Sequence, residues 1–78
     1  MPTYNGHKNR NYWNVSLWIG NDEGLYNLAR DMIRHYRTKD DAARAFVNCM
    51  KESGMHKTPD GAPYTISSVR AAFDGLDG

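Results

Sequence analysis

The stretch Tyr12-Trp13-Asn14-Val15-Ser16-Leu17-Trp18-Ile19 decides the fold class, because it is the most apolar segment of the chain and its pattern fits two structures. One set of residues alternates as in a strand: Trp13, Val15, Leu17 and Ile19. Another set shares one face of a helix: Tyr12, Val15, Ser16 and Ile19.

A strand needs a second strand for its backbone hydrogen bonds, and the only other candidate is the short piece 63–66, which begins with a proline. We therefore expect a short helix over residues 11–19 with Asn11 as its N-cap. The alternative is a strand that forms a two-stranded ribbon with residues 64–66, or that mediates a dimer.

The next segment carries a clear helical pattern. Gly20 is expected to end the first element in a left-handed conformation, and Asn21-Asp22-Glu23 then supplies a capping amide and two carboxylates for the positive end of a helix dipole. Apolar residues follow at helical spacing: Leu25, Leu28, Ala29, Met32 and Tyr36. This stripe predicts a helix over residues 22–36, and its width indicates that this helix is the central one.

Two further helices are predicted downstream. Thr38 with Asp41 three residues later resembles a capping box and opens a helix over residues 39–53, which Gly54 ends. The short connection makes this helix and the preceding one an antiparallel hairpin or a helix-turn-helix. Pro59-Asp60-Gly61 predicts a turn, and Thr65 caps a last helix over residues 66–76.

The sequence therefore predicts an all-α fold, a small four-helix domain over residues 11–78. Residues 1–10 are polar and have no apolar period, so they are expected to form a flexible N-terminal arm.

Composition and charge restrict the class of function. Ten Lys and Arg against nine Asp and Glu give a net charge of +1, so no long-range field draws the chain to nucleic acid or to a membrane. No apolar run approaches the roughly 20 residues of a membrane span. With one cysteine and no apolar signal peptide, we expect a cytoplasmic protein without an intramolecular disulfide.

No pattern of reactive side chains indicates catalysis, a metal or a cofactor. The potential metal ligands stand singly: His7, His35, His56 and Cys49. The carboxylate pairs Asp22/Glu23 and Asp40/Asp41 each open a predicted helix, where the helix dipole accounts for them. No serine lies in a nucleophile-elbow motif. We therefore expect a protein that is not an enzyme and binds no cofactor.

Two groups of residues are candidates for contact with a partner. Arg30, Arg34 and Arg37 follow at helical spacing on one face of the predicted second helix, as in phosphate-binding rows. The second group is aromatic, since a domain this small cannot bury all nine aromatic side chains. The aromatic residues expected to be exposed are Tyr4, Tyr12 and Tyr64.

Nucleic-acid binding is the less favoured use of the arginine row. In a helix-turn-helix protein the third helix would be the recognition helix and would direct its first turn at the bases. That turn is Lys39-Asp40-Asp41, and its two carboxylates would face phosphates.

The run from Trp13 to Tyr26, Trp-Asn-Val-Ser-Leu-Trp-Ile-Gly-Asn-Asp-Glu-Gly-Leu-Tyr, resembles a small domain of unknown function that recurs in short proteins of bacteriophages and mobile elements. The resemblance implies a phage protein that inhibits host machinery by stoichiometric binding. We therefore expect an anti-CRISPR-like inhibitor, a monomer or homodimer, that binds a bacterial defence-complex protein in the host cytoplasm. A small helix-turn-helix-like nucleic-acid-binding regulator is the alternative.

Overall fold

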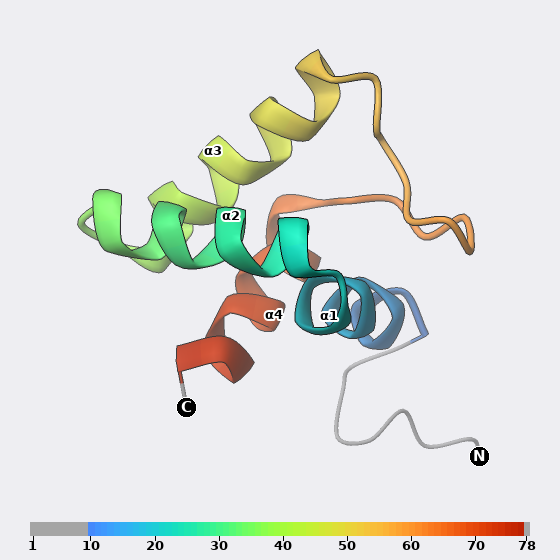
Figure 1. Cartoon of the computed structure of the whole chain (residues 1–78), viewed down its shortest axis with the longest axis horizontal. Helices are drawn as coiled ribbons and strands as arrows, with labels where there is room; N and C mark the ends of the chain where they lie inside the picture. The colour runs from blue at the N-terminus through green and yellow to red at the C-terminus, as the bar shows by residue number, and fades with distance from the viewer. Residues whose placement is uncertain (1–9, 78) are drawn as a thin grey trace.

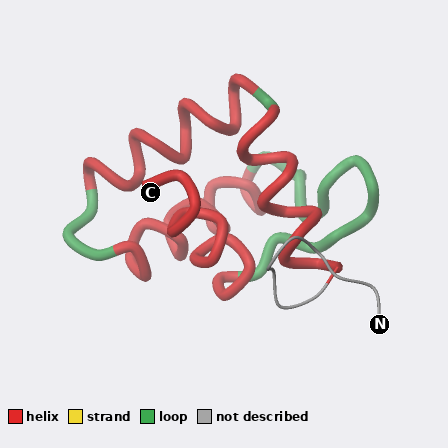
Figure 2. The backbone as a smooth tube through the Cα atoms, turned by 90° about the horizontal axis from the view of Figure 1, so that it is seen from below, coloured by secondary structure: helices red, strands yellow, loops and turns green. Residues whose placement is uncertain are grey.

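Four α-helices joined by three connections make up the computed structural model, which describes residues 10–77 (Figure 1). The helices are α1 (Arg10–Asn21), α2 (Glu23–His35), α3 (Lys39–Glu52) and α4 (Ile66–Asp77). No strand occurs within residues 10–77, where only helix and loop are drawn (Figure 2). The prediction of a small all-α, four-helix fold is confirmed. The predicted N-terminal arm lies outside the described residues except for Arg10, which begins α1.

The ambiguous apolar segment is a helix. Val15 and Ile19, one helical turn apart, are both fully buried. Asn11 is not the N-cap that we predicted, because α1 begins one residue earlier. The Asn11 side chain instead lies in the first turn, where its Nδ2 donates to the Pro63 carbonyl at 3.3 Å.

The α1–α2 junction differs from the prediction. Gly20 lies inside α1 and does not have the positive φ that we expected, because helical bonding continues past it, with the Asp22 N–H donating to the Trp18 carbonyl at 2.9 Å. The N-cap of α2 is Asp22 rather than Asn21, and Asp22 Oδ1 accepts from the Leu25 N–H at 3.0 Å. One residue therefore both separates the two helices and caps the second.

The hydrophobic core lies between α1, α3 and α4, with one residue from α2 and one from the last connection. It consists of Val15, Ile19, Ala29, Ala42, Ala43, Phe46, Val47, Met50, Tyr64, Val69, Ala72 and Phe73. Phe46 is its centre, since it packs edge-to-face on Phe73 at 5.6 Å and on Tyr64 at 6.1 Å between ring centroids.

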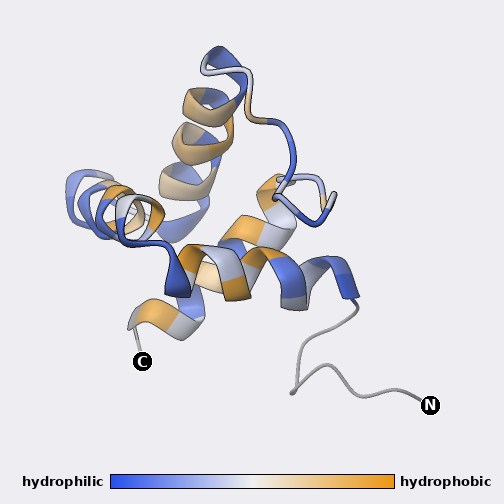
Figure 3. Ribbon diagram, turned by 45° about the vertical axis from the view of Figure 1, so that its right-hand side comes forward, coloured by the Kyte–Doolittle hydropathy of each residue, from blue (hydrophilic) through white to orange (hydrophobic). Residues whose placement is uncertain are grey.

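The prediction that the second helix is central is wrong. Ala29 is its only buried residue, and the rest of its apolar stripe packs only partly against the core. Hydrophilic and hydrophobic residues both occur along this helix (Figure 3). An apolar stripe shows that a helix has a buried side, but it does not show how many neighbours cover that side.

The α2–α3 connection sets the angle that shapes the molecule. Thr38 caps α3 as predicted, with its Oγ1 accepting from the Asp41 N–H at 3.1 Å. From this point α3 rises away from α2, so that the two helices diverge (Figures 1 and 3). Of the two predicted arrangements, the angled one is present and the antiparallel hairpin is not.

The connection between α3 and α4, residues 53–65, is the longest one (Figure 2). Gly54 and Gly61 have φ of 77° and 93°, which confirms the predicted helix stop and turn. A single antiparallel bridge joins Lys57 and Pro63. Thr65 caps α4 as predicted, with Oγ1 accepting from the Ser68 N–H at 3.1 Å. None of the described helices has the length and apolar character that crossing a membrane requires.

Candidate binding groove

An apolar recess of about 520 Å³ opens where α2 and α3 diverge, and the connection 53–65 closes its far side. We call this recess the groove. It is lined by Trp18, Asp22, Gly24, Leu25, Leu28, Cys49, Met50, Ser53, Met55, Lys57, Pro59 and Tyr64. These residues come from α1, α2, α3, the α1–α2 junction and the last connection, so the groove exists only in the folded chain.

The groove has a buried floor and an open edge. Met50 and Tyr64 form part of the floor and are only 2% and 6% exposed. Leu25 and Leu28 of α2 form one wall and pack against the core on their inner sides. Met55 stands at the edge with half of its surface, 50%, exposed to solvent. Met55 thus extends the apolar lining of the recess to the surface, and contiguous apolar surface of this kind is typical of binding sites.

The side of the groove opposite α2 is formed by the extended start of the connection. Met55, Lys57 and Pro59 alternate along it, and all three line the groove. This is the spacing that places side chains on the same face of an extended chain. The backbone is fixed at its beginning, because the Met55 N–H donates to the Met50 carbonyl at 2.8 Å.

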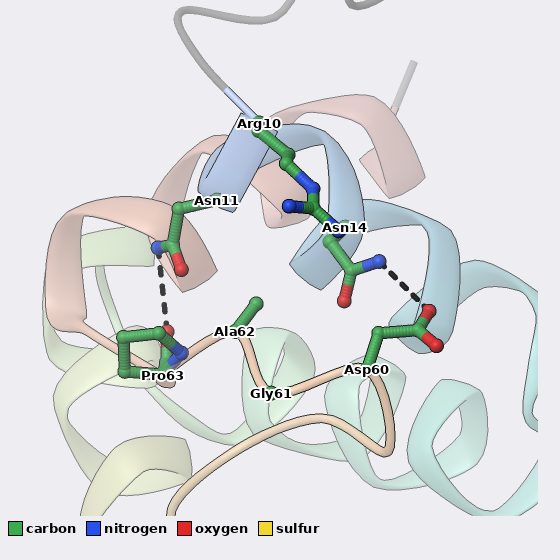
Figure 4. A pocket seen from close by; sticks show the side chains of 7 residues that line it. All are labelled: Arg10, Asn11, Asn14, Asp60, Gly61, Ala62 and Pro63. Atoms are coloured by element: carbon green, nitrogen blue, oxygen red, sulfur yellow. Dashed lines mark hydrogen bonds between the residues drawn. The ribbon is translucent and has the colours of Figure 1, made fainter.

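Four residues, Asn14, Trp18, Thr58 and Asp60, join the connection to α1, and we call them the clasp. Asp60 Oδ2 accepts from Asn14 Nδ2 at 2.9 Å (Figure 4) and from Trp18 Nε1 at 3.0 Å. The other end of the Asn14 amide accepts from the Thr58 hydroxyl, whose oxygen accepts in turn from the Ala62 N–H at 3.0 Å. The clasp therefore fixes Trp18 in place as one wall of the groove.

The clasp carboxylate is ionised at neutral pH. Hydrogen bonds from Asn14 and then from Trp18 lower the pKa of Asp60 below its ordinary value of 3.8. The charge of Arg10 acts in the same direction, and partial loss of solvent acts against it. Donors to a carboxylate stabilise its charged form, so the clasp is strongest when Asp60 is ionised.

A smaller polar recess of about 210 Å³ lies between the start of α1 and the turn of the connection (Figure 4). It is lined by Arg10, Asn11, Asn14, Asp60, Gly61, Ala62 and Pro63. Its polar groups are largely engaged with each other across α1 and the connection, which indicates a structural contact.

The predicted aromatic contact residues have different positions. Tyr4 lies outside the described residues. Tyr12 is half-buried on α1. The prediction that Tyr64 is exposed is wrong, because the connection folds back over the core and places its ring against Phe46. Burial raises the pKa of the Tyr64 hydroxyl above its ordinary 10.0, and the charge of Asp22 adds to this shift. Tyr64 still reaches the groove, as part of its floor.

The arginines do not line the groove, and only Arg30 and Arg34 share a face of α2. Arg37 follows the end of α2 and lies in the connection to α3, so the prediction that places it on the helix face is wrong. Arg34 pairs with Asp31 at 3.0 Å, and Arg30 lies 5.8 Å from the centre of the Tyr26 ring, to whose hydroxyl it donates at 3.2 Å. All three arginines are exposed.

Four residues that matter here were not candidates from the sequence: Trp18, Met55, Asn14 and Asp60. Met55 had a local signal, because it is an apolar residue that follows the helix-ending Gly54 in a polar segment. Asn14 and Asp60 had none, since 46 positions separate them in the chain.

Most of the groove lining is apolar. Cys49 lines it as a half-buried thiol. Within residues 10–77, no three side chains of His, Cys, Asp or Glu gather closely enough to hold a metal ion.

The fold and this site define a small all-α domain with an open apolar groove between diverging helices. Residues 1–73 match DUF7249, a family of unknown function, and the chain belongs to that family. No curated protein and no solved structure matches the chain.

Proposed function

We propose that this chain is a non-enzymatic binding domain that holds a protein partner in the groove. The observation that carries the proposal is the open position of Met55, which is 50% exposed beside an apolar recess walled by Trp18. The central parts of protein interfaces are rich in Met and aromatic side chains, and a few such residues provide most of the binding free energy.

We further propose that the partner belongs to a bacterial defence complex, such as a CRISPR or restriction system, and that binding occludes a working surface of that complex in the host cytoplasm. The support is the resemblance of residues 13–26 to a small domain of phage proteins, together with the small size of the chain and its net charge of +1. A compact chain of low net charge suits stoichiometric inhibition through shape and apolar contact.

An infection assay tests this function. Bacterial strains that each carry one defined CRISPR or restriction system are infected with a phage which that system restricts, and plating efficiency is measured with and without the chain. The wild-type chain should restore plating in at least one strain. Met55→Glu, which places a charge at the groove edge, should abolish the effect.

Leu17→Glu is the matched control, because Leu17 is an apolar residue 38% exposed on α1 that does not line the groove. This variant should inhibit as well as wild type. Circular dichroism melting of both variants checks that each is folded. If no system is inhibited, or if Met55→Glu inhibits as well as Leu17→Glu, the proposal is wrong.

A nucleic-acid titration tests the rival class of function. Fluorescence anisotropy with labelled duplex and single-stranded oligonucleotides should show no binding at physiological salt. Binding with a steep salt dependence that is lost on replacing Arg30, Arg34 and Arg37 by Ala would instead establish a nucleic-acid-binding protein.

A further inference from the structure

We propose that the segment which the groove accepts is one amphipathic α-helix of the partner. Its apolar stripe faces the groove floor, its basic flank faces Asp22, and its acidic flank faces Lys57. This inference rests on the proposed function and specifies the chemistry of the partner at the same site.

An extended peptide fits the groove poorly, because the connection offers it almost no backbone to pair with. Lys57 and Pro63 form the only bridge within residues 10–77, and the bonds on either side leave the Lys57 N–H and C=O directed away from the hairpin. The Met55 N–H is already bonded to Met50, and Pro59 has no N–H. Of these three residues only Lys57 offers a partner strand an N–H donor, whereas a helix satisfies its own backbone.

The lining suits a helix that presents apolar side chains along one face. Leu25 and Leu28 are one turn apart on α2, and Met50 and Met55 stand across from them with Trp18 at the end of α1. A helix places residues i, i+3 or i+4, and i+7 on one stripe about 10 Å long. Met side chains adapt their shape to such a stripe, as they do in other helix-binding grooves.

Opposite charges stand on the two sides of the groove. The α2 side carries Asp22, and the connection side carries Lys57. The groove lining includes Gly24 at the start of α2 and both Met55 and Lys57 of the connection. Asp22 Oδ1 accepts from the Leu25 N–H, which holds this carboxylate at the start of α2.

Charged pairs at the rim of an interface select the partner more than they add affinity. We therefore expect the apolar stripe to determine whether a helix binds. The two rim charges determine which helices bind and in which direction they lie.

A selection from a peptide library tests the proposal with the full chain. Random peptides of about 16 residues, roughly 24 Å long when helical, are displayed on yeast and sorted for binding to the purified protein. The enriched peptides should carry apolar residues at i, i+3 or i+4, and i+7. They should bind Leu17→Glu as well as wild type and should lose binding to Met55→Glu. Alternating apolar residues, absence of enrichment, or equal binding to Met55→Glu would overturn the proposal.

A charge reversal tests the flank assignment separately. Sorting the same library against Lys57→Glu should enrich peptides whose acidic flank has become basic. Lys51→Glu, an exposed position on α3 that does not line the groove, is the control and should leave the flank acidic. If the flank does not change with Lys57→Glu, the charge assignment is wrong.

The two sets of experiments fail independently. Inhibition that depends on Met55, combined with enriched peptides that are extended, would leave the proposed function in place and overturn only the helix. Helical peptides that bind the groove of a chain that inhibits no defence system would overturn the target class and leave the helix assignment in place.

Discussion

Asn14 is a buried side chain whose amide nitrogen and amide oxygen both form hydrogen bonds. It is 4% exposed, it donates to Asp60, and it accepts from Thr58, which is also 4% exposed. A paired buried polar group adds little to the stability of the fold, but removal of one partner leaves the other without a hydrogen bond and lowers the stability much more. The clasp is therefore a point at which a single substitution has a large effect.

Replacing Asn14 by Ala should lower the free energy of unfolding by about 1–3 kcal/mol, because the buried Thr58 hydroxyl loses its acceptor. Chemical denaturation followed by circular dichroism measures this change. Asn27→Ala, at an exposed position of α2, is the control and should change stability little. Equal stability of the two variants would show that the clasp is not formed in solution.

The clasp should also respond to acid. The folded-state pKa of Asp60 lies below its ordinary 3.8, so its stabilising effect is present above the unfolded value and is lost as pH falls through the folded value. The NMR signal of the Trp18 indole N–H should therefore shift with a midpoint below 3.8. In Asp60→Asn this shift should disappear. A midpoint at or above 3.8 would contradict the pKa direction.

At the residue scale, helix caps and helix stops could be predicted from the sequence because they depend on neighbouring residues. The Thr38 and Thr65 caps and the helix stop at Gly54 follow from neighbours within a few positions, and each was predicted. Tyr64 was predicted wrongly, because its burial depends on a connection that folds back over Phe46. No pattern within a few residues of Tyr64 contains that information.

At the element scale, the helices were predictable but their ends at the first junction were not. Capping residues and apolar spacing identify the last three segments, whereas the first was assigned to a helix because the chain offers no good partner strand. A glycine followed by capping residues is a common helix stop, yet here α1 continues through Gly20 because the turn into α2 is made at Asp22. The groove was not predictable at all, since its walls come from elements whose mutual angle depends on packing.

Two glycines should respond to the same substitution in opposite directions. Gly20→Ala should stabilise the chain by about 0.5–1 kcal/mol, because Gly20 is helical and an added Cβ meets nothing within 4 Å. Gly54→Ala should destabilise it by about 1–2 kcal/mol, because φ is 77° there. Thermal unfolding of the two variants measures both effects. Destabilisation by Gly20→Ala would indicate that α1 ends at Gly20.

At the scale of the whole molecule, binding in the groove is linked to folding of the domain. An occupant touches α2, α3 and the connection at the same time, and these segments meet only in the folded chain. A ligand that binds only the folded state stabilises it according to its concentration and affinity. Occupancy should therefore stabilise the entire domain rather than one helix.

A helical peptide that binds the groove, present at a concentration of roughly 100 times its Kd, should raise the free energy of unfolding by about 2.7 kcal/mol. Denaturant unfolding with and without the peptide measures the change. Met55→Glu should show no increase at the same peptide concentration. An increase that persists in this variant would place the peptide elsewhere on the surface.

The exposure of Met55 also makes the groove sensitive to oxidation. Peroxide converts an accessible thioether to a polar sulfoxide, and Met50, at 2% exposed, is shielded from this reaction. Samples treated with dilute hydrogen peroxide should therefore gain one oxygen at Met55 before Met50 and lose affinity for an apolar ligand, and treatment with methionine sulfoxide reductase should restore the affinity.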